Sequence, residues 1–337
     1  MAADPRSPAF EARTRAPDLS VVIPVYNEQA CLPMLAGRLY PALDALGRSY
    51  EVVFVDDGSS DRSAALLRAE YERHPAVTRV VLLRRNFGQH AALRAGFRYS
   101  RGRYVVTLDA DLQNPPEEIG KIVAQLDQGF DCVGGVRASR EDSWFRRTAS
   151  HAVNRLRERT THIRMSDHGC MLRGYHRSLV DVLNSLQEVS AFLPALAYTL
   201  AARPTEIEVR HEARAAGESK YSLLRLARLN FDLMTGFSVA PLQFLSIIGV
   251  AVAVVSGALT AYLVARRLII GPEVEGVFTL FAFVFFFLGV TLLGIGLLGE
   301  FVGRIYQQVR NLPTYLVGSV IEQPGRDEPV RDHGEPR

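Results

Sequence analysis

The stretch Tyr104–Glu118, which reads YVVTLDADLQNPPEE, sets the expectation for the fold. Its first part, Tyr104–Leu108, is an apolar run rich in β-branched side chains, which is typical of a buried strand. Asp109 and Asp111 follow where this strand ends. In an open α/β sheet, that edge is where ligands bind. Because about one DxD spacing is expected by chance in a chain with this much aspartate, the placement of the pair, more than its spacing, indicates a site.

The residues after the acidic pair predict a helix start and a cation site. In the run Asn114–Glu117 (NPPE), asparagine is the expected cap, proline falls in the first turn and glutamate takes the capping-box position. Carboxylate and amide oxygens suit a hard divalent cation, Mg²⁺ or Mn²⁺, which would in turn hold a diphosphate. The candidate metal ligands are Asp111 and Gln113, with Asp109 as a further candidate.

Other apolar runs alternate with helical patterns, one of them near Gln89–Ser100. This alternation predicts the fold class α/β, with a doubly wound, mostly parallel sheet. The loops after the first, second and fourth strands carry polar residues on the edge where a nucleotide would lie. The expected strands besides Tyr104–Leu108 are Leu19–Pro24, Tyr50–Val55, Val77–Leu83 and Phe130–Gly134.

Composition excludes some classes of protein. The chain has 337 residues, 48% of them hydrophobic and 22% charged, with a net charge of +3, so no nucleic-acid partner is indicated. Cys31, Cys132 and Cys170 are an odd, widely spaced set without CxxC, which argues against disulfides and zinc and favours reduced, cytosol-facing thiols.

Two uncharged stretches, Leu242–Val264 and Val277–Leu298, are each long enough to span a bilayer. They predict a transmembrane hairpin joined by Ala265–Gly276, so that both flanks lie on one side. A buried core hairpin is the alternative. Basic residues in the flanks outnumber Arg266 and Arg267 of the connector, which favours cytoplasmic flanks and a cytoplasmic catalytic domain. The flanking basic residues are Lys220, Arg225, Arg228, Arg304 and Arg310.

Two basic amphipathic segments, Ser143–Arg159 and Ser222–Phe237, are candidates for helices on an anionic membrane surface. For the first, a surface helix packed on the core is an equally good interpretation. Gly294–Gly299 (GIGLLG) matches the dinucleotide pattern GxGxxG, but it falls inside an apolar helix, where a close helix–helix contact is the better interpretation.

The patterns divide the chain into successive parts. We expect a disordered arm (1–18), a catalytic domain (19–212), a loop and interfacial helix (213–241), the hairpin (242–298, with spans 242–264 and 277–298) and a cytoplasmic C-terminal segment (299–337) that is disordered after about 323.

The motifs VVIPVYNE, VDDGSSD, LDADLQNPPEE and GESKY together resemble those of family 2 glycosyltransferases of GT-A fold that charge a polyprenyl phosphate with a sugar. The resemblance covers nearly the whole chain after Leu19. RNFGQH (Arg85–His90), DHGCMLR (Asp167–Arg173) and GLLGEFVGRIY (Gly296–Tyr306) look like the members that transfer 4-deoxy-4-formamido-L-arabinose. The implied reaction is inverting transfer of that sugar from UDP to undecaprenyl phosphate, for lipid A modification and polymyxin resistance. A bactoprenol glucosyltransferase, which uses UDP-glucose, is the alternative.

The resemblance also implies residue roles. Asp111 would hold the cation, Asp57 would accept a hydrogen bond from the base, and Asp167 is a candidate for acceptor-side positioning. Positive charge at the phosphates would come from Arg137, Arg214 and Lys220. The nucleoside and diphosphate would be framed by Pro24, Tyr26, Glu28, Val55, Asp57, Asp109 and Ala110.

The implied setting is the bacterial inner membrane, with a UDP-sugar, undecaprenyl phosphate and membrane lipid as partners. We expect a homo-oligomer, a tetramer, in which Thr314–Ile321 pairs between subunits. A membrane-anchored scaffold that binds a nucleotide without turnover is the rival from another class. A processive synthase and exporter would need more spans than one hairpin supplies.

Overall fold

The core of the protein is an eight-stranded mixed sheet in the order β7-β5-β6-β4-β1-β2-β3-β8. The computed structural model describes residues 16–137, 165–167, 169–186, 192–212, 240–270, 277–309 and 313–323. Strands β3, β2, β1 and β4 are parallel, so the predicted doubly wound, mostly parallel sheet is confirmed. The strands are β1 (Leu19–Val25), β2 (Tyr50–Asp56), β3 (Thr78–Leu83), β4 (Tyr104–Thr107), β5 (Cys132–Arg137), β6 (Arg173–His176), β7 (Pro204–Val209) and β8 (Val317–Ile321).

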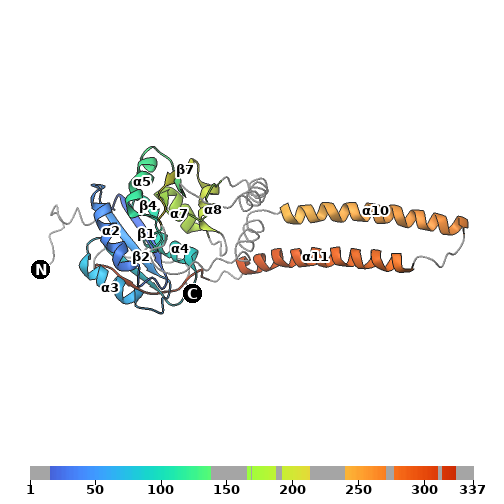
Figure 1. The fold of residues 1–337 in the computed structure, drawn as a ribbon, viewed down its shortest axis with the longest axis horizontal. Helices are drawn as coiled ribbons and strands as arrows, with labels where there is room; N and C mark the ends of the chain where they lie inside the picture. Colours follow the sequence, from blue (N-terminus) through green and yellow to red (C-terminus); the bar gives the residue numbers. More distant parts are fainter. Residues whose placement is uncertain are drawn as a thin grey trace, which may run out of the picture.

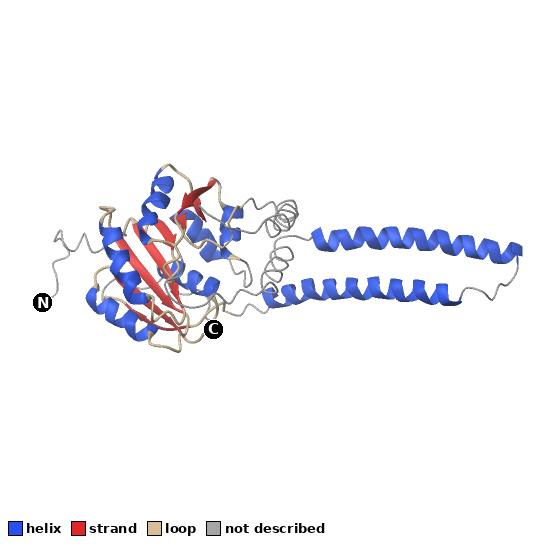
Figure 2. Ribbon diagram, in the orientation of Figure 1, coloured by secondary structure: helices blue, strands red, loops and turns tan. Residues whose placement is uncertain are grey.

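Helices cover both faces of the sheet, as Figure 2 shows. Alternate residues of each strand bury their side chains on opposite faces: Val21 and Ile23 pack in one cluster and Val22 in the other. One face is covered by α2 (Leu32–Asp44), α3 (Ser63–Arg73) and α5 (Ile119–Asp127), and the other by α4 (Gln89–Tyr99), α7 (Arg177–Ser185) and α8 (Leu193–Leu200).

The predicted helix start after the acidic pair is wrong in its details. Pro115 is extended, a 3-10 turn η1 (Pro116–Glu118) follows, and α5 begins only after it, without a side-chain cap. Asn114 is instead buried, and its Oδ1 accepts a 3.4 Å hydrogen bond from the thiol of Cys170. Asparagine is therefore used to fix the loop to the neighbouring chain segment and not to cap the helix.

The C-terminal segment returns to the sheet. Strand β8 pairs antiparallel with β3 of the same chain, with Val320 opposite Val81 and Ile321 opposite Val80. The structure thus gives Val317–Ile321, within the predicted segment Thr314–Ile321, a partner in its own chain, and the pairing between subunits stays a prediction. At the other end, Pro17 and Asp18, which were assigned to the arm, already accept backbone hydrogen bonds from residues at the start of β4.

Two long helices, α10 (Ala240–Ile270) and α11 (Val277–Val309), extend side by side away from the α/β unit (Figure 1). Helix α10 continues through half of the predicted connector Ala265–Gly276. Among the described residues, α11 contains a stretch long and apolar enough to cross a membrane, Phe286–Gly303, and none of it is buried inside the protein. The segments Ser143–Arg159 and Ser222–Phe237 lie outside the described residues.

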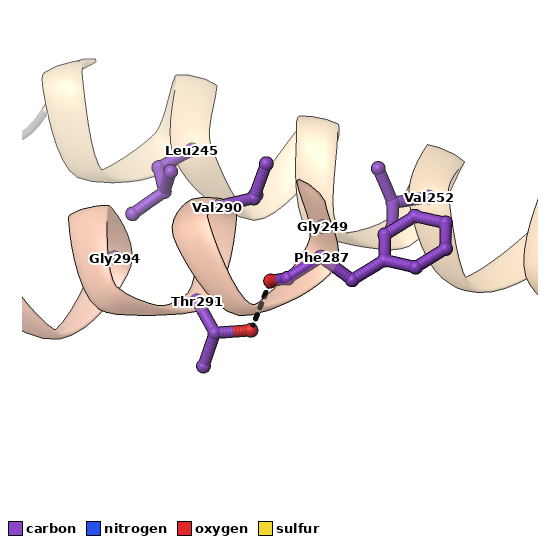
Figure 3. A pocket seen from close by; sticks show the side chains of 7 residues that line it. All are labelled: Leu245, Gly249, Val252, Phe287, Val290, Thr291 and Gly294. Carbon is purple, nitrogen blue, oxygen red and sulfur yellow. Dashed lines mark hydrogen bonds between the residues drawn. The ribbon is translucent and has the colours of Figure 1, made fainter. Parts of the chain in front are cut away.

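The space between α10 and α11 is apolar. A Cβ on Gly294 would lie 3.3 Å from the side chain of Leu245, so this glycine of the GxGxxG match does sit at a helix–helix contact. Thr291, which also lines the space, donates its hydroxyl to the backbone carbonyl of Phe287 at 2.8 Å (Figure 3). A cavity of about 410 Å³ lies here, without a charged lining group, lined by Leu245, Gly249, Val252, Phe287, Val290, Thr291 and Gly294.

Candidate functional site

The loops after the parallel strands meet at one edge of the sheet. Chain order reverses between β1 and β4, which lie next to each other in the sheet. This switch point is where open α/β sheets bind ligands, outside the carboxyl ends of the strands. Asp109 and Asp111 follow β4 and therefore lie beside this switch point, at the sheet edge that the sequence predicted.

The acidic loop is held by hydrogen bonds on both sides. Gln89, from the start of α4, donates its Nε2 to Oδ1 of Asp109 at 2.7 Å. The backbone N–H of Gln113 donates to Oδ1 of Asp111 at 3.1 Å, which closes a tight turn between these two predicted ligands. Leu112, between them, has a left-handed φ of 63° and is buried. The two carboxylates are thus oriented by neighbours while both side chains keep part of their surface at the sheet edge.

Asp57 organises the loop after β3. It is 2% exposed, and its two carboxylate oxygens accept backbone N–H groups of Phe87 and Gly88 at 2.7 and 2.8 Å. Burial raises the pKa of Asp57, against the effect of those two hydrogen bonds. Gly58 has φ +66°, and a Cβ there would lie 2.4 Å from the backbone of Arg85, so only glycine fits. Because each carboxylate oxygen has two acceptor sites, Asp57 can accept a further donor.

The other residues predicted to frame the nucleoside differ in whether their side chains are accessible. Tyr26 is 48% exposed and Pro24 and Glu28 are half-buried at the end of β1. The side chains of Val55 and Ala110 are instead buried in the two hydrophobic clusters, which leaves only their backbone for a ligand.

Arg137 and Asp167 form a two-pronged ion pair. Nε and Nη2 of Arg137 donate to the two carboxylate oxygens of Asp167 at 2.6 and 2.9 Å, and the N–H of Gly169 donates to the same carboxylate at 2.9 Å. A Cβ on Gly169 would lie 2.7 Å from Arg137 Nη2, so glycine leaves room for the guanidinium. Below them, Arg173 is fully buried and donates its Nε to the carbonyl of Cys170 at 2.9 Å. Asp167 is therefore placed to orient Arg137.

Sequence reasoning missed His211, which follows β7. Burial and the charge of Arg137 lower the pKa of His211, while Asp111 and Asp167 act in the opposite direction. These side chains therefore share one electrostatic environment, although they come from distant parts of the chain. Gln89, also missed, was within the RNFGQH motif, but the motif gave no reason to connect it with Asp109.

The donor set fits a hard divalent cation. Asp109, Asp111 and Gln113 offer side-chain oxygens at one strand end, and Mg²⁺ is commonly bound by one or two carboxylates plus substrate phosphates. In the described ranges, no three or more His, Cys, Asp or Glu side chains form a ready-made metal cluster. Arg214 and Lys220 lie outside the described residues.

The α/β unit, a doubly wound sheet with acidic side chains at its switch point, is that of a glycosyltransferase of GT-A-like fold, as the family match shows. Residues 20–183 match the model of glycosyl transferase family 2, and the chain belongs to this family.

Relatives match along almost the whole chain. An undecaprenyl-phosphate 4-deoxy-4-formamido-L-arabinose transferase of Edwardsiella ictaluri is 50% identical over 312 residues, which cover 92% of this chain and 96% of the relative. The enzyme of that name from Klebsiella pneumoniae is 50% identical over 308 residues, with 91% and 94% covered.

Among solved structures, glucosyl-3-phosphoglycerate synthase from Mycobacterium tuberculosis with Mg²⁺ and UDP is 17% identical, with a TM-score of 0.48 over 67% of this chain and 79% of that one.

Proposed function

We propose that this glycosyltransferase moves 4-deoxy-4-formamido-L-arabinose from its UDP donor to undecaprenyl phosphate, with inversion at the anomeric carbon. The observation that carries the proposal is 50% identity, over 92% of the chain, to a transferase named for this reaction. The site supports it independently, because acidic and basic side chains suited to a diphosphate and a second phosphate lie at the ends of β4 and β5 on one edge of the sheet.

On the donor side, Asp57 accepts a hydrogen bond from the base. Each of its carboxylate oxygens already accepts one backbone N–H group and can accept a second donor. Tyr26, Pro24 and Glu28 line the nucleoside, and Val55 and Ala110 contribute backbone only. Asp109, oriented by Gln89, faces the ribose and diphosphate.

Asp111 and Gln113, with Asp109, would hold Mg²⁺ or Mn²⁺, which would supply charge neutralisation for the departing diphosphate. The hydrogen bond from the backbone N–H of Gln113 orients the Asp111 carboxylate before substrate arrives. The protein therefore has little reorganisation to undergo when negative charge develops on the leaving group.

On the acceptor side, Arg137 presents its guanidinium to phosphate in the orientation set by Asp167. Arg214 and Lys220 add positive charge from the segment that follows His211. Helices α10 and α11 form a membrane hairpin with cytoplasmic flanks and termini, so that the lipid phosphate reaches the site from the inner membrane. The lipid-linked sugar then serves lipid A modification and polymyxin resistance.

The reaction needs no strong general base. A phosphate monoester has its second pKa around 6 and is already an anionic nucleophile at neutral pH. Its oxygen forms a bond to the anomeric carbon as the bond from that carbon to the diphosphate oxygen breaks, and UDP leaves with the electron pair. The chain's task is to bring two anions together, which is the work of Arg137 and its basic neighbours.

Release of UDP, measured with purified protein, undecaprenyl phosphate and single UDP-sugars, tests the proposal. We expect release with the formamido-arabinose donor that depends on both the lipid phosphate and a divalent cation. Turnover of UDP-glucose instead would assign the bactoprenol glucosyltransferase activity. Release that is independent of the lipid would contradict a phosphate acceptor. The proposed tetramer is tested separately by crosslinking in membranes, where only monomers would exclude it.

A further inference from the structure

Two residues that flank His211 are held against the turn that follows the loop Asp109–Gln113. This loop carries the proposed metal ligands and is called the metal loop below. Arg210 donates its Nε to Glu118 at 2.7 Å, and Glu118 also accepts Lys121 Nζ at 2.6 Å. Glu212 accepts two hydrogen bonds from Arg38, whose Nη1 and Nη2 lie 2.9 and 3.1 Å from its carboxylate oxygens.

Arg38 connects these two groups. Besides Glu212, its guanidinium binds Glu117 through Nε and Nη2 at 3.0 and 2.9 Å. One side chain of α2 thus bridges η1 and the end of β7 with two forks. The backbone continues the connection, because the N–H of Glu212 donates to the carbonyl of Gln113 at 2.8 Å.

We infer that this clamp of Arg38, Glu117, Glu118, Arg210 and Glu212 positions residues 210–212 against the metal loop, which makes Arg38 a positioning residue for the acceptor side of the reaction. The inference rests on the proposed function for its substrate. The clamp holds His211, whose pKa responds to the charges of Arg137 and Asp111, and it fixes Glu212, the last described residue before Arg214 and Lys220 in the sequence.

The clamp acts mainly on the β7 side. Asn114, Pro116 and Glu118, on the side of the acidic loop, are buried. Arg210 and Glu212 are exposed, so the clamp and the end of β7 are what hold them. Exposed ion pairs usually contribute little to stability, but two-pronged networks are the exception, and here the effect is on position. Loosening the clamp should therefore impair the acceptor more than the donor.

The chain offers a matched control. Arg48 also bridges two carboxylates, Asp18 and Asp127, at 2.6 Å each, and its side chain is 33% exposed against 34% for Arg38. It precedes β2 and so lies toward the opposite, amino edge of the parallel strands. Arg48→Gln removes the same kind of interaction away from the candidate site.

The test compares Arg38→Gln, Glu212→Gln, their double variant and Arg48→Gln in the full-length protein. We expect Arg38→Gln to raise KM for undecaprenyl phosphate about three- to tenfold, with kcat and the KM of the UDP-sugar changed less than twofold. The double variant should be no worse than the more impaired single variant, because both substitutions remove the same Arg38–Glu212 ion pair. Arg38→Lys should recover part of the loss, since one ammonium cannot form two forks.

Hydrogen exchange at the Glu212 amide gives a readout that needs no substrate. Its exchange should be faster in Arg38→Gln and unchanged in Arg48→Gln. Unchanged exchange together with an unchanged acceptor KM in Arg38→Gln would overturn the inference, as would an equal acceptor defect in Arg48→Gln. If wild-type protein makes no lipid-linked sugar, the proposed function fails by itself, and exchange at Glu212 still decides whether the clamp exists.

Discussion

The N–H of Glu212 donates a 2.8 Å hydrogen bond to the carbonyl oxygen of Gln113. This bond joins the end of β7 to the loop that holds the proposed metal ligands. The acidic loop and the end of β7 are therefore neighbours in space, although β5, β6 and, among the described helices, α5, α7 and α8 lie between them along the chain.

Asp111→Asn should lower kcat by about a hundredfold or more and remove the dependence on a divalent cation. The substitution takes a negative charge from the proposed ligand, and several kcal/mol of charge stabilisation are lost with it. Asp44→Asn is the control. Asp44 is an exposed aspartate at the end of α2, and it accepts a 2.7 Å hydrogen bond from the hydroxyl of Tyr50. Steady-state kinetics at several Mg²⁺ concentrations check the prediction, and metal-dependent turnover at the full rate in Asp111→Asn would contradict the metal role.

Asp167 and Arg137 should behave as one unit. Asp167→Asn and Arg137→Ala should each lower kcat/KM about tenfold or more, since either change breaks a charge-assisted fork. If Asp167 acts only by orienting Arg137, the double variant should match Arg137→Ala. Effects that multiply would instead show that Asp167 contacts the acceptor by itself.

Glu118→Gln should reduce stability in a pH-dependent way. Burial acts to raise the pKa of Glu118, but the pairings with Lys121 and Arg210 together outweigh it, so the pKa lies below its ordinary 4.5. The charged pairings therefore stabilise the fold above about pH 4.5 and are lost as pH falls through the lowered pKa. The difference in Tm between wild type and Glu118→Gln should correspond to about 1–3 kcal/mol at pH 7 and shrink below pH 4.5. Glu72→Gln, an exposed glutamate of α3, should show no such trend; a Tm difference that stays constant with pH would contradict the pairing.

The cysteines should resist alkylation in the native protein. Burial raises the pKa of Cys132 to about 12 and that of Cys170 to about 11, and Cys31 is buried as well. Thiolate, the reactive form, is therefore scarce at pH 8, and reagent has no access. Mass spectrometry after iodoacetamide treatment should find these positions modified only after unfolding. Rapid native labelling of Cys170 would contradict its contact with Asn114.

The C-terminal strand should crosslink within one chain. Val81 and Val320 lie opposite each other in an antiparallel pair, where Cα atoms are close enough for a disulfide. The variant Val81→Cys/Val320→Cys should form an intrachain disulfide under oxidation and run as a monomer on a non-reducing gel. Each single variant is the control. A disulfide-linked dimer would show that the strand pairs with another subunit.

The parallel strands were predictable from the sequence because each is a short, buried, β-branched run with a helix after it. Tyr104–Leu108, for instance, differs from the observed β4 by one residue. Strand β6, with the sequence RGYH, has no such pattern, since its first residue, Arg173, is buried by contacts to backbone carbonyls that only the fold creates.

The site was predictable where a residue type and a strand end coincide, as at Asp109 and Asp111. It was not predictable where a contact joins distant segments. Asn114 looked like a helix cap because local rules favour it there, yet Cys170 engages it in the core. Gln89 and His211 carry no local signal at all, because their roles depend on which loops the topology brings together.

The central claim is that this chain joins a sugar from UDP to a polyprenyl phosphate. The most direct measurement is mass spectrometry of the lipid product that purified protein makes from undecaprenyl phosphate, Mg²⁺ and a mixed pool of UDP-sugars. The account predicts one main product, undecaprenyl phosphate carrying 4-deoxy-4-formamido-L-arabinose, and its loss in Asp111→Asn. A pool that returns only unmodified undecaprenyl phosphate with the wild-type protein would contradict it.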